Sequence, residues 1–193
     1  VFIGTVTTGA CLSVISQTKA DNMFQITPSA SAAKVIANDN CFQVCFTDPN
    51  QGTASADYIA SKGLAKKVAV IYNSSDAYSS GIYDNFKAEA AAKGLDLVAS
   101  EAFTGDSKQD FSSQLSKIKA SGAELIYLPI YYQEASLILS QAKNAGITAK
   151  FFGCDGLDGL LNIENFDKSL AENVMLLTPF AANATDETTK KFV

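Results

Sequence analysis

The side chains best suited to binding a small molecule lie in short polar segments that directly follow apolar, strand-like runs. These segments provide hydroxyls, aromatic rings and acids, and two of them also open helices, where free N–H groups and the positive end of the helix dipole are exposed. Such a set suits a zwitterion, whose carboxylate would lie on the helix N-termini and hydroxyls while its ammonium faces Asp155. The candidates are Thr7, Thr8, Ser29, Ser31, Tyr78, Tyr131, Tyr132, Asp76 and Asp155.

The composition excludes several other kinds of chemistry. The chain has no histidine, which removes Ser-His and Cys-His catalytic pairs and the commonest metal ligand. All 15 basic residues are lysine, so an anion would have to be held by backbone N–H groups, hydroxyls or lysine. The net charge of −5 argues against nucleic acid. Neither a dinucleotide nor a P-loop motif is present, so we expect no enzyme, no cofactor and no metal.

The four cysteines predict neither a metal site nor a redox motif. Cys41 and Cys45 lie in one strand-like run, where a separation of four residues is roughly 13 Å and too long for a disulfide. No pair has C-x-x-C spacing. We expect mostly reduced, buried cysteines, with a bridge from Cys11 to another cysteine left open.

These polar segments are positioned by a repeating pattern of helix, glycine and strand. Lone glycines end four helix-length stretches at Gly63, Gly94, Gly122 and Gly146, and each is followed by an apolar run. The repeat predicts an α/β fold with a parallel sheet, whose ligands bind beyond the carboxyl ends of the strands. The predicted strands of this repeat are 67–72, 95–99, 124–129 and 150–153.

The flanking segments complete the predicted organisation. We expect strands at 1–5, 23–27 and 41–46, a helix over 9–21, a turn at 47–52 leading into a helix that ends at 62, and a loop over 28–40. A last long helix is expected over 158–171, then a strand at 173–178 and the start of a helix at 188. Residues 1–46 are interpreted as a partial first lobe, 47–178 as a complete second lobe, and 179–193 as a return toward the first lobe.

Four stretches together resemble the type I periplasmic, or extracellular, solute-binding proteins, and most closely the branch that serves branched-chain amino acid ABC transporters. The resemblance covers nearly the whole chain and identifies it as an internal part of the family's longer sequence. It implies two Rossmann-like lobes with parallel sheets that close on an amino acid. The stretches are Cys45-Phe-Thr-Asp-Pro-Asn-Gln-Gly52, Lys67-Val-Ala-Val-Ile-Tyr72, Asp110-Phe-Ser112 and Phe152-Phe-Gly-Cys-Asp-Gly156.

The resemblance also implies roles for individual residues. Thr7-Thr8 and the Ser29-Ala30-Ser31 loop match positions that hold the α-carboxylate and help with the ammonium. Tyr78 and Tyr131 match aromatic positions on the opposite lobe, and Asp155 matches an acid that pairs with the ammonium, which is glutamate in some members. The binding residues implied are therefore Thr8, Ser29, Ala30, Ser31, Tyr78, Tyr131 and Asp155.

Partners and location follow from the same resemblance. It implies a substrate-binding component of an ABC importer, outside the cell or in the periplasm, that delivers an amino acid to a permease. Lysine-only basic content suggests a Gram-positive bacterium and a lipid-anchored protein. The alternative is a ligand-sensing domain of the same fold attached to a receptor or regulator. Phe24, Ile26, Phe42 and Phe46 are strand-like residues short of partners, so self-association of the incomplete first lobe is also expected.

Overall fold

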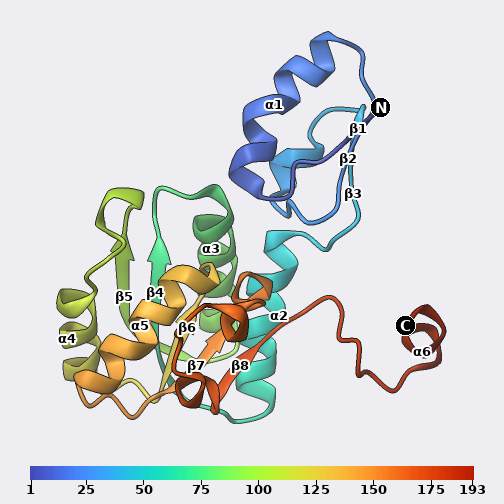
Figure 1. The fold of residues 1–193 in the computed structure, drawn as a ribbon. Coiled ribbons are helices and arrows are strands. Elements are labelled where there is room, and N and C mark those ends of the chain that lie inside the picture. Colours follow the sequence, from blue (N-terminus) through green and yellow to red (C-terminus); the bar gives the residue numbers. More distant parts are fainter.

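The computed structural model describes residues 1–193, which form two parallel β-sheets with helices packed on them (Figure 1). The first sheet has three strands in the order β1-β2-β3, and the second has five strands in the order β5-β4-β6-β7-β8. All strand pairs are parallel, which confirms the predicted α/β class. The strands are β1 (Phe2–Ile3), β2 (Gln25–Thr27), β3 (Cys41–Gln43), β4 (Lys67–Asn73), β5 (Asp96–Phe103), β6 (Leu125–Leu128), β7 (Lys150–Gly153) and β8 (Val174–Leu176).

Six α-helices connect and cover the strands, together with several short 3₁₀ turns. All four glycines that were expected to end helices take positive φ angles, between 58° and 72°. The α-helices are α1 (Thr8–Ala20), α2 (Asp48–Ser61), α3 (Ala77–Ala92), α4 (Ser112–Ser121), α5 (Tyr132–Asn144) and α6 (Glu187–Phe192), and the 3₁₀ turns are η1 (Ala33–Ile36), η2 (Gly105–Ser107), η3 (Asp155–Leu157), η4 (Leu160–Asn162) and η5 (Lys168–Ala171).

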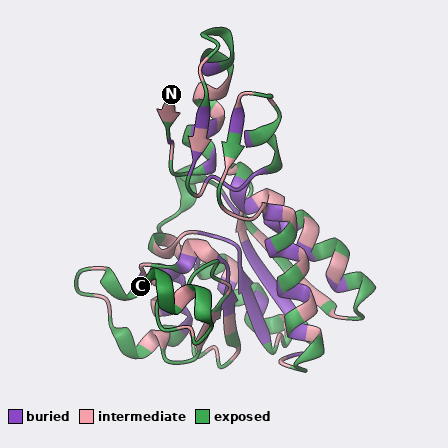
Figure 2. Ribbon diagram, turned by 90° about the vertical axis from the view of Figure 1, so that its right-hand side faces the viewer, coloured by how far each residue is buried: buried purple, intermediate pink, exposed green.

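The centre of the second sheet is buried on both faces, and its middle strands β4 and β6 are apolar over most of their length, as parallel strands between helices require. Successive residues of β4 point to opposite sides, so Val68 and Val70 pack under α2 and α3 whereas Ala69 and Ile71 pack under α4 and α5. Figure 2 shows this continuous buried centre. One face of each of two helices is buried in this centre, with Ile82, Phe86 and Ala90 on α3 and with Leu115 and Ile118 on α4, preceded by Phe111.

The first sheet carries a helix on one side only. Its row Phe2, Gln25 and Cys41 faces α1, where Gln25 and Cys41 are buried. The alternate row includes Ile3, which is 79% exposed, and Phe42, which is 47% exposed. Phe42 stacks on Phe24 at a centroid distance of 5.2 Å. This apolar face of the first sheet is open in Figure 1.

Two segments close to the second sheet differ from the sequence-based expectation. The stretch predicted as a turn at 47–52 is already helix, since α2 begins at Asp48. Its Pro49 lies in the first turn, where the missing N–H costs nothing and the fixed φ suits a helix. The long helix predicted over 158–171 is wrong: that stretch contains only the short 3₁₀ turns η4 and η5, and Asn165 between them takes a φ of 60°.

Smaller differences concern the ends of elements. β5 extends to Phe103, four residues beyond its predicted end. Phe111 is the N-cap residue of α4, and the carboxylate of the preceding Asp110 accepts a hydrogen bond from the Ser112 N–H at 2.9 Å. Residues 179–193 run away from both sheets to α6, which stands apart in Figure 1.

Candidate functional site

The loops at the carboxyl ends of both sheets meet around a cavity of about 560 Å³. The strand order of the second sheet reverses between β4 and β6, and such a switch point is where open α/β sheets bind ligands. Tyr78 and Tyr131 follow these two strands directly. The cavity, called the cleft below, is lined by Val6, Thr7 and Ser29 from the first sheet's loops and by Tyr78, Tyr131, Tyr132, Asp155, Gly156, Asp158, Thr178, Pro179 and Phe180 from the second sheet's side.

Tyr78 holds the Asp155 carboxylate in place. Its hydroxyl donates to Oδ1 of Asp155 at 2.6 Å and accepts from the Gly156 N–H at 2.9 Å. A Cβ at position 156 would lie 2.7 Å from that hydroxyl oxygen, so only glycine fits there. Burial raises the pKa of Tyr78 well above its usual value, so the hydroxyl stays neutral and can donate. The acid is therefore presented to the cleft in one orientation.

Helix α2 supports the same loop from behind. The side-chain oxygen of Gln51 accepts a hydrogen bond from the Asp155 N–H at 3.2 Å. Next to it, the buried Tyr127 hydroxyl donates to the Ser55 hydroxyl and lies 3.0 Å from the Cys154 sulfur. The loop that carries Asp155 is thus tied to α2 and to the centre of the second sheet.

Two neighbouring tyrosines form the aromatic wall of the cleft. The rings of Tyr131 and Tyr78 stack with centroids 4.7 Å apart. Tyr131 precedes the first residue of α5, and burial raises the pKa of its phenol. Tyr132 also lines the cleft. The structure therefore brings together Tyr78, Tyr131 and Asp155, which the sequence placed in three separate loops.

The loops of the first sheet contribute fewer residues to the lining of the cleft. Ser29 and Thr7 line the cleft, and the Ser29 hydroxyl donates to the Val6 carbonyl at 2.7 Å. Thr8 does not line it: this residue is buried, and its hydroxyl accepts from the N–H groups of Ser31 and Ala32. Ala30 and Ser31 are buried as well. Of the Thr7-Thr8 pair, Thr7 is the residue that faces the cleft.

Two further acids lie on the second sheet's side of this junction. Asp76, one of the candidates from the sequence, caps α3 by accepting from the Ser79 N–H at 3.3 Å, and partial burial raises its pKa. Asp48 was interpreted only as part of a turn, but it is 1% exposed in the first turn of α2. Burial raises the pKa of Asp48 to about 7. The stretch Thr47-Asp48-Pro49 places a capping residue, an acid and a proline in succession, which is typical of a helix start. This signal could have identified Asp48 as a residue of the first helical turn.

A polar recess of about 430 Å³ adjoins the cleft and shares Thr7, Tyr131 and Tyr132 with it. Lys108 and Glu134 form an ion pair of 3.7 Å in its wall. The recess extends the accessible space toward α5 and the end of β4. Its remaining lining residues are Asn73, Ser75, Asp76 and Gln133.

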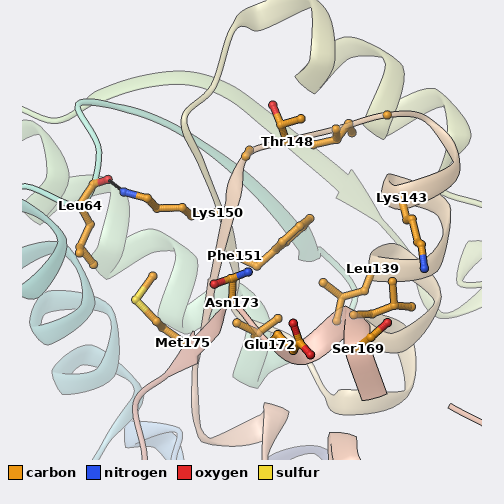
Figure 3. A pocket seen from close by; sticks show the side chains of 15 residues that line it. Leu64, Leu139, Lys143, Thr148, Lys150, Phe151, Ser169, Glu172, Asn173 and Met175 are labelled. Atoms are coloured by element: carbon orange, nitrogen blue, oxygen red, sulfur yellow. Dashed lines mark hydrogen bonds between the residues drawn. The ribbon is translucent and has the colours of Figure 1, made fainter. Parts of the chain in front are cut away.

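A larger groove of about 880 Å³ lies elsewhere, at the amino ends of β7 and β8 (Figure 3). Its wall includes Lys150, whose ammonium donates to the Leu64 carbonyl at 2.7 Å, and Phe151 and Met175. Ligands of parallel sheets bind beyond the carboxyl ends of strands, where loops open helices, and this groove is at the other end. The cleft at Asp155 is therefore the candidate site despite its smaller volume.

The fold is therefore that of a protein with two parallel α/β units and a polar and aromatic cleft at their strand ends, a cleft suited to a small ligand. No helix in this structure combines the length and the hydropathy that crossing a membrane would need. The chain belongs to the periplasmic binding protein family, whose model matches residues 1–193. The family resemblance inferred from the sequence is thereby confirmed.

Individual relatives agree with this membership. The chain is 34% identical over 157 residues to Leu/Ile/Val-binding protein homolog 3 of Brucella melitensis, covering 80% of this chain and 42% of that protein. Among solved structures, it resembles a leucine-binding protein of Thermotoga maritima with a TM-score of 0.89 and 29% identity, covering 99% of this chain and 54% of that one.

A second solved structure carries a ligand. It is the branched-chain amino acid transporter substrate-binding protein of Streptococcus pneumoniae in complex with isoleucine. Its TM-score is 0.87 at 28% identity, covering 98% of this chain and 54% of that one. The chain thus spans about half the length of the proteins that it matches.

Proposed function

We propose that the protein containing this chain is the substrate-binding component of an ABC importer and that it binds an amino acid, most suitably a branched-chain one. The observation that carries the proposal is the Asp155 carboxylate, held by the Tyr78 hydroxyl at 2.6 Å on the wall of a cleft between two α/β units. The names of the relatives, which bind leucine, isoleucine and valine, support the same class of ligand.

In this proposal each end of the zwitterion meets a different side of the cleft. The ammonium pairs with Asp155 beside the stacked rings of Tyr78 and Tyr131, whose faces favour a cation. The carboxylate lies toward Thr7 and Ser29 at the first sheet's loops, near the start of α1. Thr8, Ala30 and Ser31 shape that loop from beneath, because Thr8 accepts the Ser31 N–H.

Binding in this proposal closes two lobes. Residues 1–46 form part of the first lobe and 47–178 the second. Residues 179–193 lead away from both sheets in this structure, and we propose that they rejoin the first lobe in the full-length protein. The segments near Thr47-Asp48 and Thr178-Pro179 serve as hinges, and an ABC permease in the membrane recognises the closed form. The protein acts outside the cell or in the periplasm, where a lipid anchor would keep it at the surface. It has no catalytic role.

The test is calorimetry of the full-length protein with L-isoleucine, comparing the natural sequence with Asp155→Asn. Because the substitution removes the carboxylate that faces the ammonium, we expect the affinity to fall at least about 100-fold, as loss of a buried charge partner does. Circular dichroism should show an unchanged fold.

The matched control is Asp96→Asn. Asp96 is exposed at the amino end of β5, away from the cleft, and the substitution removes the same charge. We expect it to keep the affinity within a few-fold. Equal affinity of Asp155→Asn and the natural protein would refute the role of Asp155, and tight binding of no amino acid at all would refute the ligand class.

We propose in addition that the isolated 193-residue chain self-associates through the open face of the first sheet. Parallel sheets are normally covered on both faces, and here Ile3, Phe42 and Val44 remain exposed. Sedimentation of this chain should give a species larger than 20.4 kDa. A clean monomer would contradict this part of the proposal, without bearing on ligand binding.

A further inference from the structure

Asp48 is a buried acid without the partners that a buried charge needs. Its side chain is 1% exposed, and neither carboxylate oxygen has a hydrogen-bond partner in the chain. Isolated buried carboxylates are costly, and in practice they take up a proton instead. The Asp48 N–H donates to the Ser31 carbonyl at 2.9 Å, so this residue joins the first sheet's loop to the start of α2.

The surroundings of Asp48 contain no cation. Its carboxylate packs against α3, where a Cβ at Gly81 would lie 3.5 Å from Oδ2. The titratable groups of the neighbouring elements whose charges act on Asp48, or on which its charge acts, are acids, thiols and a phenol. They are Asp155 and Cys154 at the start of η3, Asp76 before α3, Tyr131 before α5 and Cys45 before α2. No lysine is among them.

Four features set the balance between the protonated and the ionised form of Asp48. Burial favours the protonated acid, and the negative charges of Asp155 and Asp76 act in the same direction. The nearby Ser31 hydroxyl and the N-terminus of α2 favour the carboxylate. A cation that entered the cleft beside Asp155 would shift this balance toward the carboxylate.

We propose that Asp48 carries a proton in the ligand-free protein at mildly acidic pH, up to about neutrality, and releases it when a cationic group occupies the cleft. The inference rests on the proposed function, because it takes the ammonium of an amino acid as that cation. Asp48 is then a positioning residue, because its charge acts electrostatically on the cation beside Asp155 without contacting the ligand. The proton leaves to solvent, and the carboxylate that remains adds attraction for the bound cation.

Linkage fixes the sign of the effect. If binding releases one proton, affinity rises with pH below the midpoint of Asp48, by up to about tenfold per pH unit, and levels off above it. The ammonium of the ligand stays charged throughout this range, so it adds no slope of its own. An uptake of protons on binding would require the opposite slope.

The experiment uses the full-length protein and two readouts. The first is the carboxyl ¹³C shift of Asp48 in the ligand-free protein, titrated by NMR and assigned with Asp48→Asn. We expect a midpoint near neutral pH that moves down when L-isoleucine is added. A midpoint near about 4, typical of an exposed aspartate, would overturn the proposal whatever the ligand is.

The second readout is calorimetry with L-isoleucine between about pH 5.5 and 7.5 in buffers of different ionisation enthalpy, which counts released protons. For the natural protein and for Asp84→Asn, an exposed acid on α3, we expect close to one proton at the acidic end of this range and progressively fewer above the midpoint of Asp48. Asp48→Asn should bind with no proton release and a flat pH profile. Binding by the natural protein without proton release, even at the acidic end of this range, would overturn the inference and leave the proposed function standing. If the natural protein bound no amino acid at all, the proposed function would fail and with it the release of the proton on binding, and only the protonation of Asp48 in the free protein, tested by NMR, would remain.

Discussion

The hydroxyl of Tyr78 donates a hydrogen bond of 2.6 Å to the carboxylate of Asp155, although 77 positions separate the two residues in the sequence. Tyr78 begins α3 after β4, whereas Asp155 follows β7, two strands away in the sheet. Only the parallel order of the strands brings the two loops to the same edge. The pair therefore connects the fold of the second sheet to the acid at the cleft.

Tyr78→Phe should weaken ligand binding without unfolding the protein. The substitution leaves the ring stacked on Tyr131 but removes the donor to Asp155 and the acceptor for the Gly156 N–H. A buried group left without its partner costs about 1–3 kcal/mol, which corresponds to a loss of affinity of roughly 5- to 150-fold. Calorimetry with L-isoleucine measures it. Tyr83→Phe, in the same helix and stacked on Tyr72, is the control and should keep full affinity.

Gly52→Ala should destabilise the second sheet's unit. A Cβ at position 52 would lie 2.5 Å from the Ile82 carbonyl oxygen and 2.7 Å from the Phe86 nitrogen, both backbone atoms that cannot turn aside. Overpacking of this kind typically costs about 1–3 kcal/mol. Urea unfolding of the full-length protein measures the change.

Gly9→Ala provides the matched comparison for that substitution. Gly9 is also in a helix, but a Cβ there would meet no atom within 4 Å. Alanine is the better helix former, so stability should stay equal or rise slightly. Similar losses in both variants would show that the close approach of α2 to α3 is not the cause.

Asp48 should make the ligand-free protein less stable as the pH rises. Burial raises its pKa to about 7 in the folded state, whereas an unfolded aspartate titrates near about 4. Between these values the folded state binds the extra proton, so the free energy of unfolding falls with rising pH and then becomes flat. Asp48→Asn should remove this slope. A natural protein whose Asp48-dependent stability rose across this range would contradict the assignment.

The cysteines should differ in their reaction with a thiol reagent. All four are free in the structure, and Cys11, Cys41 and Cys154 are buried while Cys45 is half-buried. Burial raises the pKa of Cys45 and of Cys154, so both react slowly, but Cys45 should be labelled first and Cys154 among the last. Mass spectrometry of the native protein gives the order. Fewer than four thiols in denaturant would instead reveal a disulfide.

The second sheet could be predicted from the sequence because its signals are local. Apolar runs such as Lys67–Tyr72, preceded by a glycine that ends a helix, define strands without reference to the rest of the chain. The helix predicted over 158–171 does not form, although its apolar residues have helical spacing, because Asn165 takes a left-handed conformation that ends helical structure. Packing against the rest of the protein decides between the two conformations, and the spacing of apolar residues carries no information about that packing.

The site was predictable in part for the same reason. Strand ends identify the loops of Tyr78, Tyr131 and Asp155, but they do not tell which of Thr7 and Thr8 turns toward the cleft. That choice depends on the hydrogen bonds of Thr8 with Ser31 and Ala32, more than 20 residues away. The burial of Asp48 likewise arises from contacts with α3, which no local pattern reveals.

The close approach at Gly52 has a mechanical consequence. Because the backbones of α2 and α3 touch there, α2 belongs to the same rigid body as the second sheet from its first turns onward. Any swing of the first sheet must then be absorbed upstream, in the few residues between Gln43 and Asp48. A torsional change confined to so short a stretch would pivot directly beside the buried acid and alter its contact with Ser31.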